Sequence, residues 1–259
     1  MSLIATKASG WSTGFGNLLD KEVGSWWRTR RWLVHLLMWL GVITGLILLV
    51  SLESGGNTMP ARGLDGAMNI FFQAGGFFSL VGAILVTQGA IIGERSYGTA
   101  AWVLTKPTTR KAFVLSKFVG ITGTFLLLSL IVPAVATLIV CQVVWGLLPG
   151  LDHFGEAIGI LALHQTFYIA LTLMLGTLFP SRGPVGGLAL GFWVAGNILS
   201  NFAPEWLTMA MPWNLARAAS AIALWNPVGV PLWIPATTTA VLIGVMLLVA
   251  LWRFEREEF

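Results

Sequence analysis

Six apolar stretches, each long enough to cross a bilayer as a helix, constrain this chain more than any other feature. A hydrocarbon core about 30 Å thick requires about 20 apolar residues of helix, because each residue rises about 1.5 Å. The stretches lie near residues 32–52, 70–92, 112–140, 154–179, 185–202 and 232–252, and none carries a charge away from its ends. Lys117 lies near the start of the third stretch, where we expect it to snorkel to the surface. The sequence predicts an all-α integral membrane protein with six transmembrane helices.

The composition excludes an ordinary soluble domain. Charged residues make up 10% of the chain and hydrophobic residues 56%, whereas a soluble domain carries about 25% charged residues. The single cysteine, Cys141, excludes a disulfide framework and any metal site built from several cysteines.

The positions of the cations predict the orientation of the chain in the membrane. If both termini lie in the cytoplasm, the cytoplasmic segments hold all but two of the 15 Lys and Arg residues. The two exceptions are Arg62 and Arg217. Short cytoplasmic loops retain Lys and Arg during insertion. We therefore expect both termini to be cytoplasmic.

Residues 1–31 have the pattern of an amphipathic helix that lies in the cytoplasmic interface. Apolar side chains at helical spacing would form one face, and they are Phe15, Leu19, Val23 and Trp26. Polar side chains would lie opposite, and they are Asn17, Asp20, Lys21 and Arg28. This pattern is typical of interfacial helices, although a disordered tail with chance aromatics is the alternative. We divide the chain into an elbow helix, 1–31, and a transmembrane domain, 32–259.

Several kinds of chemistry are missing from the sequence. No lysine follows a glycine, so the chain lacks the Walker A loop that binds ATP phosphates, and no His-Glu-x-x-His pair is present. We therefore expect no enzyme activity and no cofactor bound by this chain. A secondary carrier is also disfavoured, because ion-coupled carriers usually keep a charged residue near the bilayer midplane.

Two sets of uncharged residues inside the stretches are candidates for function. Polar residues that could line a pathway are Gln73, Gln88, His164 and Gln165; interhelical hydrogen bonds are the alternative role. Glycines at four-residue spacing, which allow close helix packing, are Gly183, Gly187 and Gly191. They could serve packing within the chain or an interface between subunits.

The segment 93–117 is the longest predicted cytoplasmic loop. Gly93 can end the second helix, and Thr99 could cap a short helix that begins near residue 100. Pro107 forbids continuation of that helix. Thr108 or Thr109 can then cap a helix that runs from residue 110 into the third span.

This loop resembles the cytoplasmic loop of ABC-2-type ABC transporter permeases. The resemblance rests on Glu94-x3-Gly98-Thr99, an apolar run to Leu104, then Pro107-x2-Arg110 and Lys117. The six-span layout and the amphipathic elbow also match that family. The resemblance implies that the loop holds a coupling helix, which docks on a separate ATPase subunit. The residues it implies for coupling are Glu94, Arg95, Gly98, Thr99, Pro107, Arg110 and Lys117, with elbow contacts through Lys21, Arg28 and Arg30.

The resemblance also implies the assembly around the chain. The permease would work as a dimer, with a second copy or a related permease, together with two ATPase subunits that hold ATP and Mg. It would lie in a prokaryotic inner membrane and export a cargo that the sequence does not identify. The segment 203–231 would form a re-entrant hairpin between the fifth and sixth spans. A membrane scaffold without transport activity is the alternative function.

Overall fold

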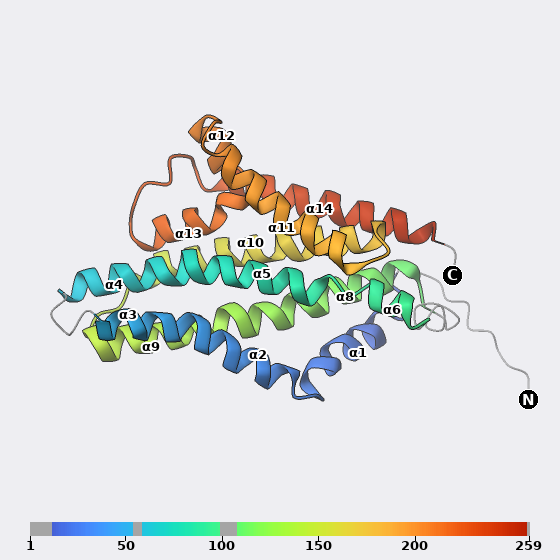
Figure 1. Cartoon of the computed structure of the whole chain (residues 1–259), viewed down its shortest axis with the longest axis horizontal. Coiled ribbons are helices and arrows are strands. Elements are labelled where there is room, and N and C mark those ends of the chain that lie inside the picture. Colours follow the sequence, from blue (N-terminus) through green and yellow to red (C-terminus); the bar gives the residue numbers. More distant parts are fainter. Residues whose placement is uncertain (1–11, 54–58, 99–107, 258–259) are drawn as a thin grey trace, which may run out of the picture.

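The computed structural model describes residues 12–53, 59–98 and 108–257, and every regular element among them is a helix. The all-α prediction is confirmed for these residues. Five helices are long and apolar enough to cross a membrane, and they run along the long axis of the molecule (Figure 1). Their bounds are Arg31–Leu52, Pro60–Ser96, Arg110–Trp145, Leu151–Leu178 and Trp233–Glu255.

The first three of these helices consist of shorter α-helical pieces. The first contains α2 (Arg31–Trp39) and α3 (Gly45–Glu53), the second α4 (Pro60–Asn69), α5 (Gly75–Thr87) and α6 (Ile92–Ser96), and the third α8 (Arg110–Leu126) and α9 (Val132–Trp145). The other two are α10 (Leu151–Leu178) and α14 (Trp233–Glu255). One π-helical turn interrupts each of the first three, at Leu40–Thr44, Ile70–Ala74 and Leu127–Ile131. Nothing in our sequence analysis predicted these turns.

The predicted fifth span forms α11 (Arg182–Leu199), which is not among the five helices. Its 18 residues would extend about 27 Å, but it is less apolar, because it contains Arg182, Asn197 and repeated glycines. The chain then forms α12 (Glu205–Met209), a 3₁₀ turn (Pro212–Asn214) and α13 (Leu215–Ala223). α13 folds back and packs along α10 (Figure 1).

α10 is the central helix of the bundle and packs against α5, α8, α11, α13 and α14. Its side chains are buried on several faces, including Phe167 and Tyr168. Gln165 connects three helical elements: its Oε1 accepts from Ser129 Oγ at 3.1 Å, and its Nε2 donates to Ser79 Oγ at 2.8 Å. Polar contacts of this kind hold helices together in lipid, where apolar contact alone gains little.

The N-terminal amphipathic helix forms as α1 (Phe15–Trp27). Of the predicted apolar face, Trp26 is buried and the other three residues are half-buried, whereas the predicted polar residues are exposed. Leu18, which the pattern did not place on the apolar face, is buried as well. α1 packs against α8. Gly120 permits this approach, because a Cβ atom there would lie 2.9 Å from Glu22 Cβ.

We expect Gly120→Leu to destabilise the contact between α1 and α8. The added side chain would force the two helices apart, at a cost of about 1–3 kcal/mol. Gly123→Leu is the matched control, because Gly123 lies on the same helix and a Cβ atom there meets nothing within 4 Å. Thermal unfolding of the full chain in detergent checks this prediction. Equal unfolding temperatures for the two variants would contradict it.

Candidate functional site

Four helices bring charged side chains together at one end of the bundle. α1, α6, the start of α8 and the end of α14 all lie at the right-hand end in Figure 1, and polar contacts connect them with the end of α10. This end contains the described part of the predicted coupling loop, from Gly93 to Gly98 and from Thr108 to Lys117.

Lys117 occupies the centre of a charged cluster between α1, α6 and α8. Its side chain is 3% exposed, and its Nζ lies 2.8 Å from Glu22 Oε1 and 3.1 Å from Glu94 Oε1. Lys21 Nζ lies 3.0 Å from the same Glu94 oxygen. The expectation that Lys117 snorkels to the surface is therefore wrong. Two carboxylates from other helices compensate its charge, so it stays buried.

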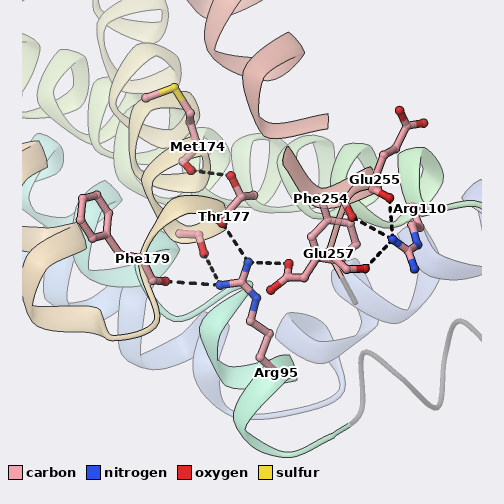
Figure 2. A network of polar contacts seen from close by, with 9 residues as sticks. Arg95, Arg110, Met174, Thr177, Phe179, Phe254, Glu255 and Glu257 are labelled. Carbon is pink, nitrogen blue, oxygen red and sulfur yellow. Dashed lines mark hydrogen bonds and ion pairs between the residues drawn. The ribbon is translucent and has the colours of Figure 1, made fainter. Parts of the chain in front are cut away.

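Arg95, the neighbour of Glu94, binds the end of α10. Its Nη1 donates to the carbonyl oxygens of Gly176 and Phe179, at 3.0 and 3.3 Å, and its Nη2 donates to Thr177 O at 3.0 Å (Figure 2). The last carbonyls of a helix have no partner within the helix, and a cation there is favourable. Arg95 Nη2 also lies 2.6 Å from Glu257 Oε2 in the C-terminal tail.

Arg110 makes the equivalent contact with α14. Its Nη1 donates to the carbonyl oxygens of Glu255 and Glu257, at 2.7 and 2.6 Å (Figure 2). The helix that carries Arg110 begins as predicted, because Thr109 Oγ1 accepts from Ala112 N at 3.1 Å. The described coupling candidates Glu94, Arg95, Arg110 and Lys117 therefore have partners within the chain.

The tip of the loop has a different character. Tyr97 is 79% exposed, and Gly98 follows it with φ of +66°. The prediction that Gly93 ends the second helix is wrong, since α6 continues through Gly93 to Ser96. Gly98 takes that role because the left-handed conformation beyond a helix end favours glycine. Two coupling candidates, Thr99 and Pro107, lie outside the described residues.

The three elbow candidates differ in their surroundings. Lys21 contacts α6 through Glu94. Arg28 forms a surface pair with Asp20 at 3.3 Å, in which both side chains are about three-quarters exposed. Arg30 is exposed.

The four pathway candidates do not come together. His164 and Gln165 are buried in the bundle. The hydrogen bonds of Gln165 to Ser79 and Ser129 agree with the alternative role, a hydrogen bond between helices. Gln73 is exposed and donates to Asn69 Oδ1 on its own helix, at 3.1 Å. Gln88 lines a cavity of about 240 Å³ between α5 and α11 and also a larger cavity of about 510 Å³ at the charged end.

Some glycines of α11 lie on an open face of the helix, and others lie in close contact with the rest of the chain. A Cβ atom at Gly183, Gly187 or Gly191 would meet nothing within 4 Å, and all three glycines are exposed. The close contacts within the chain come instead from Gly186, against Gln88, and from Gly196, against Trp213. Packing within this chain therefore does not explain the four-residue repeat.

Sequence reasoning missed how closely the chain's own helices bind the loop.

A family model described as "Protein of unknown function (DUF2705)" matches residues 41–259. The chain belongs to this family. No curated protein matches the chain. The part of this chain that the DUF2705 model matches contains Glu94, Arg95, Arg110 and Lys117, whereas α1 lies before it.

Proposed function

We propose that this chain is the membrane-spanning subunit of an ABC-2-type ABC transporter, which exports its cargo with energy from separate ATPase subunits. Two copies, or one copy and a related permease, would form the pathway, and two ATPase subunits would bind ATP and Mg. The chain itself would hydrolyse nothing. The resemblance of the loop supports the family, and the geometry at the charged end supports the role of the loop.

The observation that carries this proposal is the pair of neighbours Glu94 and Arg95. Glu94 is bound to α1 and α8 through Lys21 and Lys117. Arg95 is bound to the end of α10 and to the tail that follows α14. A displacement of α6 would therefore move four other helices. Rigid-body rearrangements of packed helices are a usual basis of switching between two states, so α6 is well placed to receive force from a partner.

The membrane arrangement is part of the proposal. We place the charged end in the cytoplasm, so that the positive-inside rule holds, with both termini on that side. α11 would be the sixth spanning helix, although its glycines make it less apolar than the others. The segment 203–231, which includes α12 and α13, would be a re-entrant hairpin at the outer end. Its irregular backbone is tolerated because α13 packs against protein.

The exposed face of α11 would form the dimer interface, and we expect Gly187→Leu to weaken the dimer. The glycine face is open in the single chain, and small residues allow two helices to approach closely in lipid. Gly244→Leu is the matched control, because Gly244 is an exposed glycine of α14 with nothing near its Cβ position. Cross-linking in membranes measures the dimer fraction. Equal fractions for the two variants would contradict this interface.

The direct test of the function is co-purification with ATP-binding cassette subunits encoded beside this chain. ATP hydrolysis should appear only when both subunits are present. We expect Tyr97→Arg to reduce the co-purified ATPase at least about tenfold, because exposed aromatics are frequent anchors of interfaces. Trp206→Arg is the control, since Trp206 is 65% exposed but lies on α12, away from the charged end (Figure 1).

The scaffold alternative makes a different prediction in the same experiment. A scaffold would bind partners without changing their ATP hydrolysis, and vesicles that contain the complex would accumulate no cargo. ATP hydrolysis by the purified chain alone would contradict both alternatives.

A further inference from the structure

A cavity of about 510 Å³ opens at the charged end, beside the Lys117 cluster. α1, the start of α2, the end of α5, α6, α8 and the first residue of α11 line it. Its volume lies within the roughly 300–1,000 Å³ of small-molecule sites. The proposed transport mechanism assigns no role to this cavity.

The charges that line the cavity leave an excess of two positive charges. Four cationic side chains line it, and the two carboxylates that accompany them are Glu22 and Glu94. Both carboxylates are paired with lysines at 2.8–3.1 Å. Arg31 and Arg182 are the other two cations, and neither side chain has a hydrogen bond or ion pair with any residue that the structure describes. The excess charge therefore lies on two arginines.

The two arginines come from separate helices that line one cavity. Arg31 begins α2, and Arg182 begins α11. The Arg182 guanidinium lies over the turn after α5, because a Cβ atom at Gly89 would be 3.3 Å from Arg182 Cζ. A guanidinium binds phosphate through two parallel hydrogen bonds, which makes arginine the preferred residue for phosphate recognition.

The rest of the lining is apolar on one side. It includes Leu85, Val86 and Ile121, and Leu85 is 61% exposed. A ligand with an anionic head and an apolar tail matches both parts of the lining, whereas a free phosphate ion would use only the arginines. Basic pockets between membrane helices are known to accommodate lipid headgroups.

We propose that this cavity binds the phosphate of an anionic phospholipid between Arg31 and Arg182, with its acyl chain beside Leu85 and Val86. The site requires only that the chain lies in a membrane, so it does not depend on the transport function. A lipid there would connect α2, α5 and α11 at the surface of the bilayer.

Lipid binding to the purified full chain tests the proposal. The chain in uncharged detergent is titrated with phosphatidylglycerol or with phosphatidylcholine, and bound copies are counted by native mass spectrometry. We expect one tightly bound phosphatidylglycerol and weaker binding of phosphatidylcholine. The double variant Arg31→Gln/Arg182→Gln should bind phosphatidylglycerol about 25-fold more weakly, at about 1 kcal/mol per cation. Because neither arginine side chain has a hydrogen bond or ion pair with a described residue, the thermal unfolding temperature should not change.

A second double variant distinguishes lipid binding in the cavity from general attraction to positive surface charge. Arg30→Gln/Arg256→Gln removes the same charge from residues that do not line the cavity, and its affinity should stay within about twofold of the native value. An equal loss in both double variants would overturn the proposal, as would equal binding of the two lipids. Displacement of phosphatidylglycerol by millimolar inorganic phosphate would also overturn it, since the cavity would then be a site for the free ion.

Discussion

Lys117→Met is expected to lower the apparent unfolding temperature of the chain by about 6–12 °C. The lysine is 3% exposed and lies within 3.1 Å of two carboxylates. Its removal leaves Glu22 without its cation in a largely buried position. Loss of one partner from a buried ion pair costs on the order of 3 kcal/mol, because the other charge remains desolvated. Thermal unfolding of the purified chain in detergent provides the measurement.

Lys111→Met is the matched control for this prediction. Lys111 lies 3.4 Å from Glu255, but both side chains of this pair are 45% exposed. Exposed pairs contribute about 0–1 kcal/mol, so the unfolding temperature should change by no more than about 3 °C. Similar shifts for the two variants would show that the buried cluster does not stabilise the contact between α1, α6 and α8.

Arg95→Gln is expected to separate binding of the ATPase from its activity. The variant loses the contacts between α6 and the end of α10, while Tyr97 stays exposed for a partner. If α6 transmits force as proposed, stimulation of ATP hydrolysis by the chain should fall at least about tenfold, within the usual range of coupling energies. The amount of co-purified ATPase should change by less than about twofold. ATP hydrolysis by the reconstituted complex measures the effect.

Arg28→Gln is the control for Arg95, because it also removes an arginine at the charged end. Among the residues that the structure describes, the ion pair of Arg28 is with Asp20, on the surface of its own helix. Its loss should leave ATP hydrolysis unchanged. If Arg95→Gln and Arg28→Gln gave the same activity, the contacts of Arg95 with α10 and the C-terminal tail would have no role in coupling.

Local sequence signals predicted the local structure well. Apolar stretches gave helices, helical spacing identified Trp26 but not Leu18 among the buried residues of α1, and a threonine after a proline gave the N-cap at Thr109. These features depend on residues a few positions apart, so their physical causes can be read directly from the sequence.

The partners of the charged residues could not be predicted in the same way. Arg95 binds Thr177, and Arg110 binds Glu255. The two residues of each pair lie far apart in the sequence, so no local pattern indicates the contact. The sequence presented Lys117 as a surface cation because Glu22 and Glu94 reach it only when α1 and α6 pack against α8. The π-helical turns within three of the long helices likewise have no signature that we recognised.

The most direct test of the coupling role is to locate Tyr97 relative to the membrane and to a partner. Tyr97→Cys is combined with Cys141→Ser, so that the loop carries the only cysteine of the chain. We expect a membrane-impermeant maleimide to label this cysteine in inside-out vesicles but not in intact cells. A bifunctional cross-linker should join it to the ATPase subunit. Labelling in intact cells, or no cross-link in a complex that hydrolyses ATP, would contradict the account.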